Sequence, residues 1–332
     1  MIDWITAIIP CHGAGRLVGS RILCIDANGE IEWETNRRVS VEGSYSSAVQ
    51  VKAEGRRRLW VSGNPSKFLQ GHNLFGSNGL RKLIVVFMLE LADRLGLEPT
   101  QEDFDVWLAG RYVLKRVDVA ACFRLPSTLQ VDNWIRSASP LVRGKHQGVS
   151  QYGGETIYVG QRSRRISLKI YNKGREIRKH PPCKSIPYRE ELFEFSEGLL
   201  RAEVTIRAQE LKRRNLDKAW RWKPGTGDTI LRERIGRLEM PKKLRLTATE
   251  IADLPPRLVG AVKLWEAGHD LRSVYPRATF YRYRGELRRY GVDISSPPRT
   301  ATNVVPLVTY LEAEYEAEVP DWAVGTSLLA CS

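Results

Sequence analysis

The chain has 332 residues and a formal net charge of +14, from 52 Lys and Arg against 38 Asp and Glu. This excess favours a polyanionic partner, and since we find no basic amphipathic helix of the membrane-lying kind, we expect nucleic acid and no membrane. Five scattered cysteines without a CxxC pair exclude a disulfide framework and a zinc knuckle. The longest apolar run, residues 83–89, is too short to cross a bilayer, and the N-terminus lacks a signal-peptide pattern, so we expect a soluble intracellular protein.

The first third of the chain is predicted to contain several strands and then a helix. Asn28-Gly29 is a hairpin-turn signal between two apolar runs. Apolar residues recur at helical spacing from residue 80, with Ser77 or Asn78 to cap the helix and Gly96 to end it. In chain order we expect strands over 2–9, 21–25, 48–54 and 58–62, and a helix over 80–95.

The middle of the chain continues this pattern up to Arg207, after which it becomes helical and basic. Strands are expected over 104–108, 112–123, 156–159, 166–171 and 199–206, and helices over 127–137 and 189–197. The sequence therefore predicts an α+β fold, a largely antiparallel sheet with helices on one face, followed by a mainly helical part. Since the chain is long for one core, we predict a domain that carries the chemistry, 1–210, and a basic helical domain, 211–332.

Three predicted strands place chemically useful side chains on one face of the sheet. Because side chains alternate along a strand, the apolar positions around them leave Asp118, Tyr171 and Glu203 on the opposite face, among Arg and Lys. Carboxylates can hold a divalent cation, and a nearby tyrosine can attack phosphorus to form a covalent phosphotyrosine. Basic neighbours would lower the pKa of the tyrosine. Periodicity alone leaves another interpretation open, a solvent-exposed face on which acids pair with bases.

Five segments carry a resemblance to a known family: KFLQGHNLFGS, LKRVDVAA, ISLKIYNKGREI, LFEFSEGLLRAEVTIR and NVVPLV…VPDW. In this order, from Lys67 to Trp322, they resemble the gene II/X replication initiation proteins of filamentous phages. The middle part is also similar to plasmid rolling-circle initiators, which implies a nickase core of the HUH or RRM-like type. The resemblance implies site-specific nicking of double-stranded replicative DNA in the cytoplasm of a bacterial host, with Tyr171 of KIYNKG as the nucleophile.

The resemblance leaves the metal ligands in question. Related nickases carry a His-hydrophobic-His strand, and the strand that we equate with it offers only Asp118. We expect His72 to complete a site for Mg²⁺ or Mn²⁺ together with Asp118 and Glu203; the alternative is a histidine that caps a turn.

Other residues near Tyr171 have alternative interpretations. Tyr152 and Tyr158 are rival nucleophiles, although Tyr158 lies in an apolar strand and suits packing. Lys173 follows Tyr171 by two positions and is expected to share its face, where it binds the scissile phosphate or assists the tyrosine. A plain surface lysine is the alternative.

Two basic patches are predicted to bind DNA. The first surrounds the proposed nucleophile and includes Arg162, Arg164, Arg165, Lys169 and Arg175. The second, over residues 266–291, resembles a helix-turn-helix in which Arg277, Arg282 and Arg284 reach a groove. For each patch the alternative is an ordinary solvated or amphipathic surface.

We therefore expect a replication initiator that nicks one strand of supercoiled origin DNA, keeps the 5′ phosphate on Tyr171 and later rejoins the displaced strand. Such an enzyme needs a metal, Mg²⁺ or Mn²⁺, and works with a host helicase and polymerase on double-stranded and single-stranded origin DNA. Two alternatives remain open: a non-enzymatic nucleic-acid-binding regulator, and a metal-dependent nuclease that uses water without a covalent step.

Overall fold

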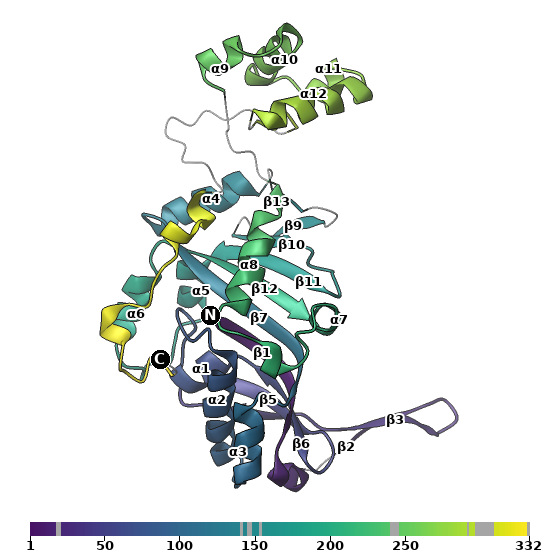
Figure 1. Ribbon diagram of the computed structural model, residues 1–332, viewed down its shortest axis with the longest axis vertical. Helices are drawn as coiled ribbons and strands as arrows, with labels where there is room; N and C mark the ends of the chain where they lie inside the picture. Colours follow the sequence, from purple (N-terminus) through teal and green to yellow (C-terminus); the bar gives the residue numbers. More distant parts are fainter. Residues whose placement is uncertain are drawn as a thin grey trace.

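The structure, a computed structural model, describes residues 1–17, 21–139, 142–144, 148–152, 155–239, 246–290, 292–295 and 309–330. Its centre is a nine-stranded sheet in which all neighbouring strands run antiparallel (Figure 1). The order is β4-β5-β6-β1-β7-β12-β11-β10-β9. Its strands are β1 (Ile2–Pro10), β4 (Val39–Glu42), β5 (Ala48–Ala53), β6 (Arg58–Gly63), β7 (Val113–Arg124), β9 (Val149–Tyr152), β10 (Thr156–Val159), β11 (Ile166–Asn172) and β12 (Leu199–Arg207).

Helices cover one face of this sheet. In β1 the side chains of Ile5, Ala7 and Ile9 are fully buried, whereas Trp4 and Thr6 on the other face are half-buried. Helices α2 (Leu80–Arg94), α4 (Thr128–Ala138) and α8 (Thr226–Gly236) pack their apolar residues into the core on the buried face, and Figure 1 shows α8 crossing β7 and β12. The predicted α+β architecture is confirmed. The opposite face carries polar side chains at its centre, and at one end an apolar cluster with residues of α5 (Lys173–Lys179) and α6 (Arg189–Ser196) packs over Cys122 and Leu199.

Residues 104–108 form part of helix α3 (Gln101–Leu108), so our prediction of a strand there was wrong. A capping box begins the helix, because the Thr100 hydroxyl accepts from the Asp103 amide and the Asp103 carboxylate accepts from the Thr100 amide. Trp107 is buried and its indole Nε1 donates to the carbonyl of Pro10 at 2.7 Å. The cap and this tertiary contact outweigh the strand-like alternation of the segment.

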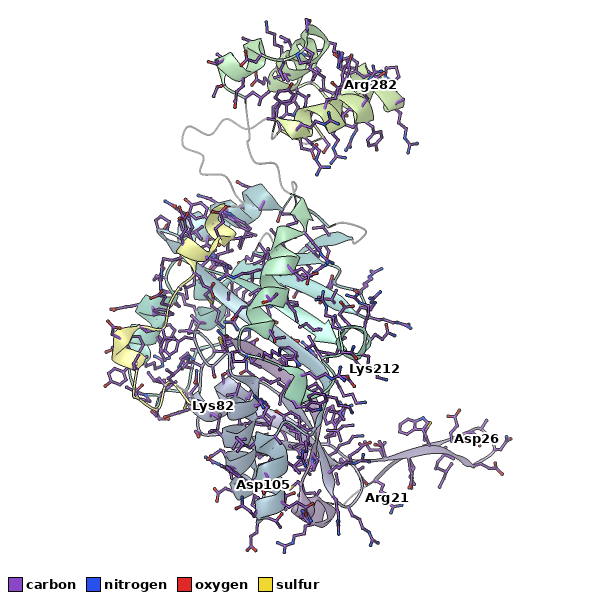
Figure 2. The ribbon with its side chains drawn as sticks, viewed as in Figure 1. Arg21, Asp26, Lys82, Asp105, Lys212 and Arg282 are labelled. Atoms are coloured by element: carbon purple, nitrogen blue, oxygen red, sulfur yellow. The ribbon has the colours of Figure 1, made fainter. Side chains whose placement is uncertain are left out.

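A two-stranded hairpin projects from the sheet domain (Figure 1). Strands β2 (Arg21–Ile25) and β3 (Ile31–Asn36) pair as predicted, and Gly29 at their turn has the positive φ of 86° that glycine tolerates. Figure 2 shows Asp26 at the tip. The hairpin exposes several large apolar side chains, among them Ile25, Ile31 and Trp33.

The helices after β12 belong to two different hydrophobic cores. Helix α7 (Ala208–Arg213) and α8 bury Leu211, Ile230 and Leu231 in the core beneath the sheet. A separate core forms within α9 (Ala248–Ala252), α10 (Pro256–Glu266), α11 (Leu271–Val274) and α12 (Arg277–Arg289), around Leu258 and Phe280. The segment 266–291, which resembles a helix-turn-helix in sequence, contains the end of α10, the short helix α11 and the basic helix α12.

The last described segment, residues 309–330, packs against the sheet domain. The amide of Ala317 donates to the carbonyl of Cys122 in β7 at 2.8 Å, and the amide of Ala330 donates to the Gln70 side chain at 3.0 Å. Side-chain packing thus places residues 211–238 and 309–330 with the sheet. That residues 1–210 carry the chemistry and 211–332 form a separate basic domain stays a prediction. Within the described ranges, no helix has the length and apolar character needed to cross a membrane.

Candidate active site

Three neighbouring strands bring the predicted catalytic side chains onto the polar face of the sheet. In the register of β12 with β7, Thr205 lies opposite Asp118, and in its register with β11, Arg201 lies opposite Tyr171 and Glu203 opposite Lys169. Paired residues share a face, so Asp118, Glu203 and Tyr171 all lie on this one. The Tyr171 hydroxyl makes a long contact of 3.5 Å to Glu203 Oε2.

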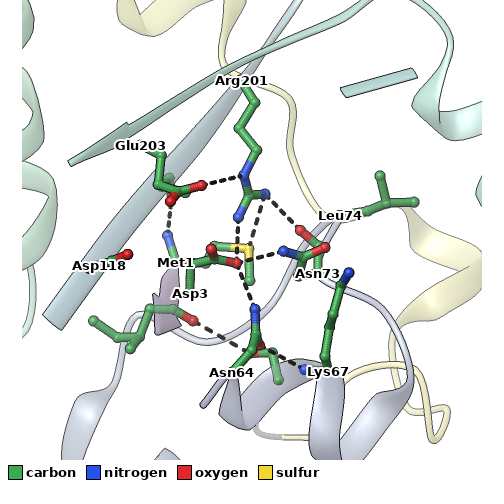
Figure 3. Close-up of polar contacts among 12 residues, drawn as sticks. Met1, Asp3, Asn64, Lys67, Asn73, Leu74, Asp118, Arg201 and Glu203 are labelled. Carbon is green, nitrogen blue, oxygen red and sulfur yellow. Dashed lines mark hydrogen bonds and ion pairs between the residues drawn. The ribbon is translucent and has the colours of Figure 1, made fainter. Parts of the chain in front are cut away.

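A buried ion pair that we did not predict lies at the centre of this site (Figure 3). The Arg201 guanidinium is fully buried and donates to Asp3 Oδ1 at 2.6 Å and to the carbonyl of Asn73 at 2.6 Å. Asp3 Oδ1 also accepts from the side-chain amides of Asn64 and Asn73, at 2.9 and 2.7 Å. An irregularity in the β1–β7 register between Ile2 and Trp4 lies at Asp3. Strict alternation would place the adjacent residues Asp3 and Trp4 on opposite faces of the sheet. Periodicity therefore could not predict that Asp3 belongs to the site.

The Glu203 carboxylate is the least compensated charge of the site. Burial raises its pKa to about 7, and the nearby carboxylates of Asp3 and Asp118 add to this effect. Arg201 opposes it, but its Nε lies 3.9 Å from Glu203 Oε2 and has no hydrogen-bond partner within the described structure. Glu203 therefore exchanges its proton near neutral pH.

Tyr171 is almost completely buried. Burial raises the pKa of its hydroxyl well above the usual value, and Arg201 only partly opposes this. The expected lowering of this pKa by a basic neighbour is present, from Arg201, but burial outweighs it. Lys169 Nζ lies 4.0 Å from the ring centroid, over the face of the ring and not at the hydroxyl. Ionisation of Tyr171 thus needs a further positive charge or a base.

Asp118 is buried beside the half-exposed Arg116. The Arg116 guanidinium donates to both carboxylate oxygens, at 2.8 and 2.5 Å. Burial nevertheless raises the pKa of Asp118, because desolvation outweighs this ion pair and the charge of Asp3 adds to it. Arg116 is half-exposed, so this ion pair lies between the buried site and the surface.

His72 is a structural residue in this arrangement, as the alternative interpretation of it held. Its Nε2 contacts the carbonyl of Leu328 at 3.0 Å and its Nδ1 accepts from the Leu74 amide at 3.3 Å. With both ring nitrogens engaged by the backbone, His72 has none left for a metal. Burial also lowers its pKa to about 3.

The low pKa of His72 predicts that acid weakens the fold. Between the ordinary value of 6.5 and about 3, the folded protein binds fewer protons at this site than the unfolded chain, so stability falls as the pH falls through this window. When the pH falls from 7 to 5, the free energy of unfolding of His72→Gln should fall by about 2 kcal/mol less than that of the wild type. Urea unfolding at the two pH values measures this, with the exposed His180→Gln as control. An unchanged pH dependence in His72→Gln would contradict the assignment.

Lys173 lies just beyond the end of strand β11 at Asn172, but its side chain still reaches the polar centre of the site, because it contacts Asn73, whose carbonyl accepts from Arg201. It is the first residue of helix α5 (Lys173–Lys179), where its buried ammonium donates to Asn73 Oδ1 at 2.8 Å and to Glu176. Burial lowers its pKa to about 8. The strand ends at Asn172, whose side chain caps the helix by accepting from the Arg175 amide, and this cap turns Lys173 away from the strand pattern.

Two parts of the chain match known family models. Residues 1–224 match the family model for the N-terminal part of the gene II replication-associated protein of phages, and residues 257–328 match the model for its C-terminal part. The chain belongs to the gene II family.

Two relatives from Enterobacteria phages illustrate the similarity. The replication-associated protein of Enterobacteria phage I2-2 is 35% identical, covering 96% of this chain and 95% of the relative. The replication-associated protein of Enterobacteria phage M13 is 25% identical, and the alignment covers 85% of this chain and 82% of the relative. A solved rolling-circle replication initiator from Geobacillus stearothermophilus aligns with a TM-score of 0.30 and 12% identity, over 79% of this chain and 95% of that one.

The arginines that we predicted to bind DNA differ in whether they already have an acidic partner within the protein. Arg162 and Arg164 are exposed near the start of β11, and Arg277 and Arg282 are exposed on α12. The others have protein partners: Arg165 pairs with Glu210 at 3.0 Å, Arg175 with Asp132 at 2.5 Å, and Arg284 bidentately with Asp293 at 2.7 Å. The pair with the buried Asp293 gives Arg284 a structural role, which makes it a poor candidate for groove contacts.

The carboxylates of the site fit a hard divalent cation that is shared with a substrate. Among the residues that the structure describes, no three His, Cys, Asp or Glu side chains converge to hold a metal. Asp118 and Glu203 nevertheless offer only oxygen, and burial raises the pKa of both carboxyls, although Asp118 is paired with Arg116. Mg²⁺ is commonly held by one or two carboxylates together with phosphate oxygens and water. Asp118 and Glu203 are thus the oxygen ligands that this site could offer to such an ion together with a substrate phosphate.

Proposed function

We propose that this chain is a replication initiator that nicks one strand of origin DNA and rejoins it, with Tyr171 as the nucleophile. The observation that carries the proposal is the meeting of Tyr171, Glu203 and Asp118 on one polar face of the sheet, around the buried Arg201. Membership of the gene II family of replication-associated proteins supports the same role.

In the proposed reaction Tyr171 Oη attacks the phosphorus of one strand. The bond from phosphorus to the 3′ oxygen breaks, this oxygen takes up a proton from water and leaves as a 3′ hydroxyl, and the 5′ phosphate stays on the tyrosine. Glu203 Oε2, 3.5 Å from the hydroxyl, is placed to accept the phenolic proton. Because the phosphotyrosine keeps the energy of the broken bond, a later attack by a 3′ hydroxyl reverses the step and rejoins the strand.

Asp118 and Glu203 would hold Mg²⁺ or Mn²⁺ beside the scissile phosphate. A bound cation would neutralise the phosphate oxygens and favour ionisation of the buried tyrosine. Arg116, released from Asp118, is positioned to contact a phosphate. We further propose that the exposed arginines of α12 take part in origin recognition, and that a host helicase and polymerase extend the nicked strand in the bacterial cytoplasm.

One experiment tests the proposal against its two rivals. The chain is incubated with supercoiled origin DNA and Mg²⁺, denatured, and examined for relaxed DNA and for protein that stays attached to DNA. Relaxed DNA with attached protein is expected. Relaxed DNA without attached protein would indicate a nuclease that uses water, and binding without any relaxation would indicate a regulator.

The same assay tests the metal site. Asp118→Asn and Glu203→Gln should each slow Mg²⁺-dependent nicking roughly a hundredfold to a thousandfold, because each removes a charged ligand while keeping its shape. Asp105→Asn, an exposed acid on α3, is the control and should nick normally. Full activity of both site variants, or activity of the wild type in EDTA, would rule out the proposed metal site.

A further inference from the structure

A band of tryptophan and cationic side chains extends the polar face of the sheet away from Tyr171. Trp4 of β1 lies opposite Asp118 of β7, and the Arg116 guanidinium lies 5.3 Å from the centroid of its ring. Trp60 of the next strand, β6, carries the exposed Arg38 guanidinium at 4.7 Å and Lys52 Nζ at 5.9 Å. We call Trp4, Trp60 and these three cations the tryptophan band.

The band is continuous with the candidate active site. Between the two indoles, the hydroxyls of Thr6 and Ser62 bond at 2.7 Å, and Trp4 Nε1 donates to Ser62 Oγ at 3.3 Å. The sheet order β6-β1-β7-β12-β11 then leads from Trp60 through Trp4 and Asp118 to Tyr171. One face of five adjacent strands thus carries the indoles at one end and the proposed nucleophile at the other.

The two indoles lie on the accessible side of the sheet. Along β1 and β6 the alternate residues Ile5, Ala7 and Val61 are fully buried beneath the helices, whereas Trp4 and Trp60 are half-buried. Packing in the core therefore does not account for these two large aromatic side chains. Cations within about 6 Å of both rings make the surroundings attractive to a chain of phosphates.

Unpaired DNA is the ligand that suits this combination. Indoles stack on any base, and cations beside them track the backbone, which is how proteins bind single strands without reading sequence. Bases in a duplex are stacked on one another and cannot reach a flat sheet face. Stacking of a base on tryptophan is stronger than a cation–π contact at an accessible site, so a base can displace the arginine from the ring and leave it free for a phosphate.

We propose that Trp4 and Trp60 are stacking platforms for the unpaired nucleotides of the strand whose phosphate reaches Tyr171. This inference rests on the proposed function, in which a strand must leave the duplex to enter the site. The tryptophan band then holds the melted strand in line with the nucleophile, and the arginines turn from the rings to its phosphates.

The test measures binding without cleavage. In a Tyr171→Phe background with EDTA, the affinities for a labelled single strand and for the same sequence as duplex are measured by fluorescence anisotropy. Trp4→Leu and Trp60→Leu should each weaken single-strand binding about 5- to 100-fold and leave duplex binding within about twofold. Trp220→Leu is the matched control, since this exposed indole in η2 (Ala219–Arg221) carries Arg221 at 4.7 Å but lies outside the band.

A second measurement covers the case in which a leucine variant fails to fold. Trp4→Phe and Trp60→Phe keep an aromatic ring, and each should remove part of the quenching of tryptophan fluorescence that a bound single strand causes in the Tyr171→Phe parent. Unchanged single-strand affinity in the leucine variants, unchanged quenching in the phenylalanine variants, or equal losses on duplex would overturn the inference. Because no step needs cleavage, these outcomes are independent of whether the wild type nicks DNA.

Discussion

Tyr171→Phe is expected to abolish nicking while leaving the fold and DNA binding intact. The substitution removes only the attacking oxygen, so the rate should fall about 10⁴-fold or more. Stability should change by less than about 1 kcal/mol, because among the described residues the hydroxyl makes only the long 3.5 Å contact to Glu203. Relaxation of supercoiled origin DNA and the yield of protein-linked DNA measure the activity, and urea unfolding measures the stability.

Tyr158→Phe is the matched control for this prediction. Tyr158 lies in the neighbouring strand β10, opposite Lys169, and therefore shares the face of Tyr171. Lys169 Nζ is 5.9 Å from its ring. If Tyr158→Phe lost the protein-linked product while Tyr171→Phe kept it, the nucleophile would be Tyr158. The other rival, Tyr152, lies in β9, which pairs with β10 at Thr156, and its variant completes the set.

The strands around the site could be predicted because their periodicity is local. The alternation in residues 166–171 and 200–207 fixes which side chains share a face, and the register of β11 with β12 then places Tyr171 beside Arg201 and near Glu203. Helix α3 could not be recognised by alternation, since its start is defined by the capping box of Thr100 and Asp103. Hydrophobic pattern was decisive where strands were long, and local hydrogen bonds were decisive where an element was short.

The polar centre of the site could be predicted only in part. Asp118, Glu203 and Tyr171 follow from alternation, but Asp3 reaches the site through an irregular register, and Asn73 reaches it from a loop. Burial was the other unknown, because a sequence does not reveal that Arg201 and Tyr171 are both inaccessible. For His72, the partner that determines its role is the carbonyl of Leu328, 256 residues further along the chain. Only the folded chain brings these groups together.

Arg201→Met is expected to be the most destabilising single substitution in the site. It removes a fully buried guanidinium and leaves the buried carboxylate of Asp3 without its cation, which typically costs about 3–5 kcal/mol. Arg207→Met is the matched control on the same face of β12. Its half-buried guanidinium donates to the Ser167 hydroxyl at 3.1 Å, and its loss should cost less than about 1.5 kcal/mol.

The double variant Asp3→Asn/Arg201→Met separates loss of the ion pair from loss of packing. The asparagine introduced in place of Asp3 still offers an oxygen to the amides of Asn64 and Asn73 but carries no charge. The double variant should therefore be more stable than Arg201→Met alone, because no carboxylate is left buried without its cation.

The effect of Arg201→Met should also depend on pH. In the wild type, desolvation would raise the pKa of Asp3, but Arg201 and the Asn73 amide hold it below its ordinary value. The stability that this pair contributes is therefore present above the ordinary pKa and is lost as the pH falls through the pKa of the folded state. In Arg201→Met, burial without the cation should raise the pKa of Asp3, and the deficit should shrink as the pH falls toward about 4. Urea unfolding at neutral and at mildly acidic pH measures both effects. A deficit below about 1 kcal/mol at neutral pH, or one that grows in acid, would show that Asp3 and Arg201 do not hold the site together.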